Sequence, residues 1–253
     1  MLHLLFLLKM TNMKLVDRKI NCIVLLLMIA SLFVFVCSCK NEIEVAETTE
    51  TKIMTLAETL GIDINDYIFI LANIDNPIGE YEPTLVEVQS NRLFDERAAD
   101  YLKQFIADGR SAGIPIYLSS TYRSYETQKM LYDKKVEQYG EEEAKTIVLP
   151  PGTSEHQTGL CADITDVYRE LKTKKLENTE TFKWLYDNCD KYGFILRYPK
   201  DKEDITKVIY EPWHFRYVGE VAAKYMKEHS LCLEEFLILA DEVIADKDIN
   251  YNE

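Results

Sequence analysis

The sequence predicts an α+β fold in which helices flank a small, mainly antiparallel sheet. Short runs rich in β-branched and aromatic residues indicate strands, and longer runs with apolar residues at helical spacing indicate helices. These runs do not alternate as regular βαβ units, which disfavours a parallel sheet. The 253 residues, with 47% hydrophobic and 28% charged side chains, have the composition of an ordinary globular protein.

The first predicted elements of the domain are a strand and a long helix. Residues 67–73 (YIFILAN) are β-branched and aromatic, which predicts a strand. Residues 94–113 place apolar side chains at helical spacing and carry glycines near their end, which predicts a helix. The apolar positions of this helix are Ala98, Leu102, Phe105 and Ile106.

A second strand and a second helix follow, and then a loop. Residues 115–123 (PIYLSSTYR) predict a strand, and the helix after it begins at Ser124, a favourable N-cap, and closes at Gly140. Residues 150–159 (PPGTSEHQTG) are rich in turn formers and predict a loop.

The second half of the domain follows from the same patterns. We predict a buried strand at 160–167, a helix at 179–193, strands at 194–199 and 213–218, and one or two helices, broken at Ser230, over 219–241.

The N-terminal segment resembles an export signal and is not expected to be part of the fold. Basic residues precede an apolar run over residues 23–36, which is shorter than the about 20 residues that span a bilayer. The run ends in Val-Cys-Ser-Cys39, which resembles a bacterial lipobox. We therefore expect residues 1–38 to be a lipoprotein-type signal peptide and Cys39 to carry a lipid, with an uncleaved signal anchor as the alternative.

The rest of the chain predicts one domain with an acidic segment on either side. Residues 39–57 are acidic and rich in threonine, which predicts a linker between membrane and domain. Residues 58–245 predict the single domain, and residues 246–253 an acidic tail. The expected location is the outer face of a bacterial cell membrane.

Charge and cysteine usage narrow the possible functions. The formal net charge of −14 argues against a nucleic-acid partner, because phosphates require a basic footprint. Beyond the N-terminal segment, Cys161, Cys189 and Cys232 show no CxxC spacing. We interpret them as small buried residues and not as zinc ligands.

Two of the four histidines lie among residues that could perform chemistry, His156 in SEHQTGLCAD and His214 in EPWHFRY. A nucleophilic pair of Ser154 and His156 is disfavoured, because residues two apart on an extended chain are about 6.5–7 Å apart at their backbones. A zinc site fits better, since catalytic zinc takes three protein ligands and keeps a fourth position for water. His156, Asp163 and His214 would supply them.

The residues around these three support a common mechanism. Asp163 lies in an otherwise apolar strand, where a carboxylate is costly unless it is paired or bound to metal. Gly159 lets the backbone turn between His156 and Asp163, and Glu211 is placed to accept a proton from zinc-bound water. Each residue alone also admits a purely structural role, but together they match one mechanism.

A third segment, STYRSYETQ, suggests substrate binding. Arg123 falls at the junction of a strand and a helix N-terminus, where a cation and free backbone N–H groups favour a carboxylate or an oxyanion. Gln128 lies about one helical turn further on. The alternative is that Arg123 pairs only with a neighbouring acid. Tyr122 and Trp213 are candidates for the cleft wall, although either could equally lie in the core.

These segments resemble the signatures of the VanY-like D-alanyl-D-alanine carboxypeptidases, a zinc peptidase family that includes the LdcB-type L,D-carboxypeptidases. SEHQTGLCAD fits S-x-H-x-x-G-x-x-x-D, EPWHFRYVG fits E-x-W-H-x-x-Y-V-G, and YRSYETQ lies upstream. The resemblance covers roughly residues 65–240. Two positions depart from the pattern: Thr121 stands where the family often has glycine, and Cys161 where it usually has alanine.

The resemblance implies a fold and a set of roles. The fold would be the α+β zinc-peptidase fold shared by these carboxypeptidases and lysostaphin-type enzymes. His156, Asp163 and His214 would bind Zn²⁺, and Glu211 would be the catalytic base. Residues Arg123, Gln128 and Ser154 would line the substrate site.

The implied activity is removal of the C-terminal D-alanine from peptidoglycan stem peptides by a monomeric enzyme. The motifs leave open whether the bond is of the D,D or the L,D type, and whether Arg123 binds an oxyanion or the substrate carboxylate. Two alternatives remain: a cell-wall endopeptidase of the same fold, and a peptidoglycan-binding lipoprotein without catalysis.

Overall fold

A computed structural model describes residues 54–166 and 172–244, which belong to one unit spanning Lys52–Glu253. The predicted signal peptide, its lipid site at Cys39 and the acidic tail lie outside the described residues. Among the described residues, no helix has the length and apolarity needed to cross a membrane.

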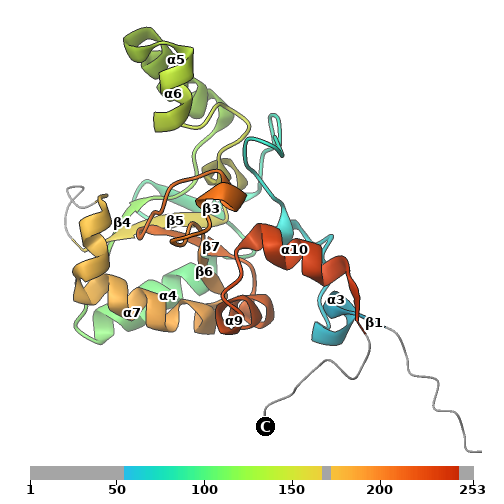
Figure 1. The fold of residues 1–253 in the computed structure, drawn as a ribbon. Coiled ribbons are helices and arrows are strands. Elements are labelled where there is room, and N and C mark those ends of the chain that lie inside the picture. Colours follow the sequence, from blue (N-terminus) through green and yellow to red (C-terminus); the bar gives the residue numbers. More distant parts are fainter. Residues whose placement is uncertain (1–53, 167–171, 245–253) are drawn as a thin grey trace, which may run out of the picture. The chain divides into compact units, whose positions relative to one another are not determined.

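Four antiparallel strands form the central sheet, in the order β4, β5, β7, β6 (Figure 1). Their bounds are Tyr117–Ser120 for β4, Cys161–Thr165 for β5, Phe194–Leu196 for β6 and His214–Tyr217 for β7. All four were predicted from the sequence, and their antiparallel pairing confirms the α+β fold class.

The two central strands present different chemistry on their two faces. Side chains alternate along a strand, and Ala162 and Ile164 of β5 join Phe215 and Tyr217 of β7 in the apolar core. The intervening side chains are also buried, but they are polar or bear donor atoms: Cys161, Asp163, His214 and Arg216. The sheet therefore has one face for packing and one face for chemistry.

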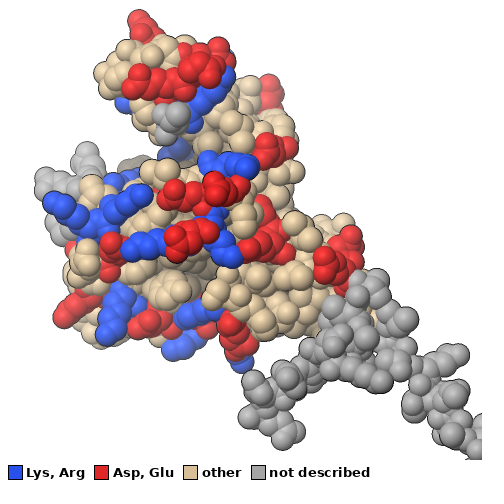
Figure 2. Space-filling model, viewed as in Figure 1, with Lys and Arg blue, Asp and Glu red and all other residues tan. Residues whose placement is uncertain are grey.

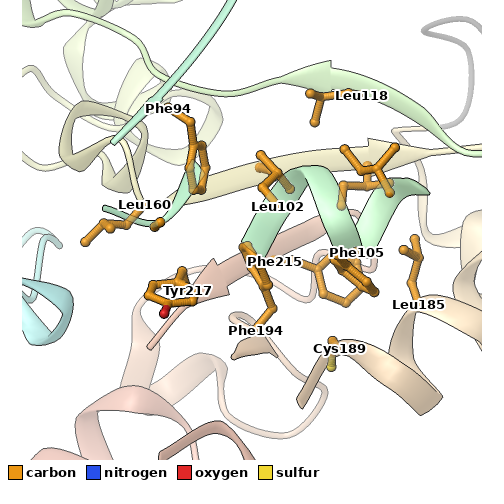
Figure 3. Packing of buried hydrophobic residues seen from close by; sticks show 14 of the residues in the cluster. Phe94, Leu102, Phe105, Leu118, Leu160, Leu185, Cys189, Phe194, Phe215 and Tyr217 are labelled. Carbon is orange, nitrogen blue, oxygen red and sulfur yellow. The ribbon is translucent and has the colours of Figure 1, made fainter. Parts of the chain in front are cut away.

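Helices α4 (Ala99–Ser111) and α7 (Glu180–Asn188) cover the apolar face (Figure 1). Phe105 of α4 lies at the centre of this core, with its ring centroid 5.5 Å from that of Phe194 and 5.7 Å from that of Trp184 (Figure 3). Helix α7 continues as a 3₁₀ helix, Cys189–Tyr192, and ends at Gly193, whose φ of 77° is left-handed. The predicted helix 179–193 is thus confirmed, with a tightened last turn.

A second apolar cluster joins the N-terminal and C-terminal helices. Helices α3 (Leu56–Leu60), α9 (Glu220–Glu228) and α10 (Leu233–Asp241) contribute to it, and short strands β1 (Met54–Thr55) and β8 (Val243–Ile244) pair beside it. The break between α9 and α10 contains Ser230, as predicted, with a φ of 54°. Residues 54–57, assigned to the linker from sequence, lie in β1 and α3.

Helices α5 (Tyr125–Tyr139) and α6 (Glu141–Ile147) form a pair beyond the polar face of the sheet (Figure 1). Ser124 caps α5 by accepting a hydrogen bond from the Thr127 N–H, as its residue type predicts. Acidic side chains gather on this pair, whereas acidic and basic side chains are interspersed over the rest of the face drawn in Figure 2.

The structure corrects two parts of the prediction. Residues 67–73 do not form a strand: Tyr67–Phe69 is a 3₁₀ helix whose Asp66 side chain accepts from the Ile68 N–H. Strands β2 (Leu85–Gln89) and β3 (Arg92–Asp95) form a hairpin that the sequence-based prediction omitted. Strand β3 takes the first residues of the predicted helix 94–113, so α4 starts only at Ala99.

Short elements complete the described fold. Besides the two 3₁₀ helices above, they are the 3₁₀ helices Glu155–Thr158 and Lys174–Asn178 and the one-turn helix α8, Glu203–Thr206.

Candidate metal centre

The three predicted metal ligands meet on the polar face of the sheet. His156 lies in the 3₁₀ helix Glu155–Thr158, and Gly159, with a φ of 72°, turns the chain directly into β5 and Asp163. A side chain at Gly159 would also press on the Asp95 backbone N at 3.2 Å. His214 arrives from β7, where it pairs directly with Asp163. Strand pairing therefore supplies the third member of the cluster.

Asp163 lies between the two imidazoles. Its Oδ2 is 3.4 Å from His156 Nε2, and its Oδ1 is 3.2 Å from His214 Nδ1. The Oδ1 atom is buried without a hydrogen-bond partner, because that contact lacks hydrogen-bond geometry. Lys172 donates to Oδ2 at 2.6 Å. A buried carboxylate oxygen between two imidazoles is a suitable donor for a metal ion.

The opposite nitrogen of each imidazole is held by the protein. His156 Nδ1 lies 2.6 Å from the Thr121 carbonyl oxygen, and His214 Nε2 lies 3.3 Å from Glu155 Oε2. Metal-binding histidines in proteins have their second nitrogen held in this way, which orients the ring and selects its tautomer. His156 Nε2 and His214 Nδ1 are left to face Asp163.

In the absence of metal, the groups of the cluster stabilise one another's charged forms. Burial raises the pKa of Cys161, but His156 and His214 outweigh it and lower the pKa to about 7. Burial also raises the pKa of Asp163, yet the two histidines and Lys172 hold that pKa well below its usual range. Conversely, burial lowers the pKa of His156, and Cys161 and Asp163 raise it to about 9.

Glu155, which the sequence-based prediction passed over, anchors His214 from behind. Its Oε1 accepts from Arg197 Nε at 2.6 Å and from Arg216 Nη1 at 2.7 Å, and both arginines are fully buried. Arg197 also binds both carboxylate oxygens of Glu234, at 2.6 and 2.8 Å. Together the two arginines hold the pKa of Glu155 far below its usual range, although burial acts to raise it.

A sequence signal for this network existed. Arg197 and Arg216 lie within the short apolar segments FILRYP and WHFRYV, which were predicted as strands, as Asp163 lies within LCADIT. The argument that a charge inside a buried strand needs a partner applies equally to all three. Applied to the arginines, it would have predicted a buried acid, but not which one.

Glu211, the predicted base, lies at the edge of the cluster. Its Oε2 is 3.6 Å from His214 Nδ1. Partial burial raises the pKa of Glu211, and this effect is larger than the opposing effect of His214, which lowers it. A carboxylate with a raised pKa holds a transferred proton better near neutral pH, as general base catalysis requires.

The cluster opens into a cavity of about 570 Å³. Four of the predicted substrate residues line this cavity: Arg123, Gln128, Ser154 and Trp213. The fifth, Tyr122, is not among the lining residues. Arg123 Nη1 donates to Gln128 Oε1 at 2.7 Å, and Gln128 Nε2 donates to the Leu149 carbonyl oxygen at 2.6 Å. Gln128 thereby orients the guanidinium within the cavity.

We expect Glu155→Gln to destabilise the metal-free protein by about 3–5 kcal/mol, because both arginines lose a buried counter-charge. The same change should weaken zinc binding about 10–100-fold through loss of the hold on His214. Denaturant unfolding and competition with a chelator measure the two effects. Glu211→Gln, which has no arginine partner, serves as control and should change stability by less than about 1 kcal/mol. Equal losses in both variants would contradict the assigned role of Glu155.

Comparison with known proteins identifies the family. The family model described as VanY, D-alanyl-D-alanine carboxypeptidase, matches residues 91–220. A D-alanyl-D-alanine carboxypeptidase of Enterococcus faecalis is 38% identical over 205 residues, which cover 76% of this chain and 74% of that protein. The Bacillus subtilis protein YodJ, named as a carboxypeptidase, is 44% identical over 163 residues, and the match spans 60% of its length.

Solved structures agree with the sequence relatives. A zinc complex of a point mutant of the vancomycin-resistance D,D-pentapeptidase VanY matches with a TM-score of 0.60 and 38% identity, over 68% of this chain and 99% of that one. The LdcB LD-carboxypeptidase matches with a TM-score of 0.57 and 43% identity, over 65% and 77%. The chain therefore belongs to the VanY family of D-alanyl-D-alanine carboxypeptidases.

Proposed function

We propose that the chain is a zinc-dependent carboxypeptidase that removes a C-terminal D-alanine from peptidoglycan stem peptides. The observation that carries the proposal is the buried cluster of His156, Asp163 and His214, with Glu211 beside it and Arg123 in the same cavity. The related D-alanyl-D-alanine carboxypeptidases and the zinc-bound VanY structure support this assignment.

The residues present fit a zinc ion. Two neutral imidazole nitrogens and one carboxylate oxygen are a common donor set for catalytic zinc, and Asp163 Oδ1 is a buried acceptor without a hydrogen-bond partner. When bound, zinc supplies a Lewis acid for the scissile carbonyl and a water with a pKa of about 7.

Glu211 would move the proton in this reaction. Its Oε2 accepts a proton from the attacking water and then passes it to the leaving amino group, so that one carboxylate serves both steps. Its position at the mouth of the buried cluster leaves it accessible to substrate from the cavity.

Arg123 would bind substrate charge. Among the described residues its guanidinium donates to Gln128 through Nη1, and its other donors are available for a terminal carboxylate or a developing oxyanion. Its backbone N–H donates to the His156 carbonyl oxygen at 3.0 Å, which couples the position of the cation to that of the cluster.

For localisation, we propose a monomeric lipoprotein at the outer face of the cell membrane. The support is the basic and apolar N-terminal pattern that ends at Cys39. Cells given labelled palmitate should label the wild-type chain, and Cys39→Ala should abolish the labelling. Equal labelling of both chains would contradict the assignment.

The decisive test of activity is product analysis. Zinc-loaded protein incubated with defined tetrapeptide and pentapeptide stems should release single D-alanine, and a chelator should stop the release. Release from the pentapeptide alone would indicate D,D-specificity, and release from the tetrapeptide alone L,D-specificity. A longer fragment would indicate an endopeptidase, and binding without turnover a cell-wall binding protein.

Glu211→Ala should retain bound zinc and lose about 10²–10⁴-fold in turnover, because the proton acceptor is absent while the cluster of His156, Asp163 and His214 stays complete. Metal content of the purified variant and single-turnover rates check the two halves. Near wild-type hydrolysis by this variant would overturn the assignment of Glu211 as the base.

A further inference from the structure

The metal cluster contains a sulfur atom that the proposed mechanism leaves unused. Cys161 and Asp163 are two residues apart on β5, so their side chains project from the same face of the strand. The Cys161 Sγ and one ring nitrogen each of His156 and His214 all lie within 4.8 Å of one another. The thiol therefore occupies the same small space as the proposed zinc ligands.

This position is not that of an ordinary core cysteine. Cys161 is fully buried, yet it belongs to neither of the two apolar clusters. Cys189 offers the contrast, because it packs within the main apolar cluster and its Sγ donates to the Tyr186 carbonyl oxygen at 3.5 Å. All three cysteines in the described part of the chain are free.

A second, independent feature points to a ligand at this place. Asp163 is 3% exposed, and its Oδ1 has no hydrogen-bond partner although it lies 3.2 Å from His214 Nδ1. Unpartnered buried acceptors are uncommon in folded proteins, and a bound ion is one of the arrangements that accounts for them. The Asp163 carboxylate and the Cys161 thiol thus both lie beside the same two imidazoles.

We propose that Cys161 is a further metal donor, so that the site of this chain binds its ion through a thiolate as well as through His156, Asp163 and His214 and keeps a fifth position for water. On binding, the S–H bond breaks, a sulfur–metal bond forms, and the proton passes to solvent. Thiolate is a softer donor than imidazole or carboxylate, so the site is biased toward Zn²⁺ and Cd²⁺ over Mn²⁺.

The inference rests on the proposed metal site but not on which peptide bond is cut. Its test is X-ray absorption at the zinc edge of the zinc-loaded protein. The wild-type chain should show a sulfur scatterer at about 2.3 Å, which zinc–thiolate bonds require, in addition to nitrogen and oxygen at about 2.0–2.2 Å. Cys161→Ala should retain zinc and lose the sulfur scatterer.

Cys189→Ala is the matched control, because it also removes a buried thiol and lies in the apolar cluster. It should keep the sulfur scatterer. In competition titrations, Cys161→Ser should bind Cd²⁺ at least about tenfold more weakly than the wild type. Loss of a group that only orients a ligand already lowers metal affinity about 10–100-fold, and loss of a ligand should lower it at least as much. Cys189→Ala should bind Cd²⁺ as the wild type does. Thermal unfolding of each metal-free variant verifies that it is folded.

The outcomes separate this inference from the proposed function. Zinc held by nitrogen and oxygen alone in the wild-type chain would overturn the role of Cys161 and leave the predicted ligand set of His156, Asp163 and His214 standing. A folded wild-type chain that binds no zinc would overturn both. A sulfur scatterer that persists in Cys161→Ala would also exclude Cys161 as its source.

Discussion

The buried carboxylate of Glu155 is the group on which the rest of the site depends. Arg197 and Arg216 are both fully buried and both donate to its Oε1, while its Oε2 faces His214. Neither arginine could remain charged in the interior without a counter-charge, because an unpaired buried ion costs several kcal/mol. Glu234, in α10, provides a second counter-charge for the Arg197 guanidinium. One ionic network therefore fastens β6, β7, the C-terminal helix and the metal cluster together.

The metal cluster differs from the Glu155 network, in which every buried charge has a partner. Its donor atoms are brought together, and among the described residues Asp163 Oδ1 has no hydrogen-bond partner. The saturated network behind His214 fixes one of the imidazoles of this cluster. Such preorganisation reduces the movement needed when an ion binds. The thiol of Cys161 lies beside these donors, and we propose that it binds the metal. The thiol of Cys189 packs in the apolar core and is not part of the metal cluster.

The sequence by itself predicted the chemistry of the site. Only four histidines occur in 253 residues, and the two that lie in segments with acids at motif spacing led to the prediction of His156, Asp163, His214 and Glu211. It also determined the strands of the central sheet, whose apolar and aromatic runs are local signals. The strand predicted at 67–73 was wrong because a local run of β-branched residues does not show whether a partner strand is present. Here the Ile68 and Ile70 carbonyl oxygens accept hydrogen bonds from the Arg216 side chain and not from a neighbouring strand.

Only the tertiary structure decided which residues support the site. The pairing of His214 with Asp163 depends on the register of β5 and β7, and the pairing of Glu155 with Arg197 and Arg216 depends on how loop, sheet and helix pack. The contacts of Glu155 leave no motif of fixed spacing in the sequence, since its partners Arg197 and Arg216 are 42 and 61 residues away. Cys161 is the sharpest case. In sequence it is a small residue in an apolar strand, and only the face on which β5 places it brings its sulfur to the metal cluster.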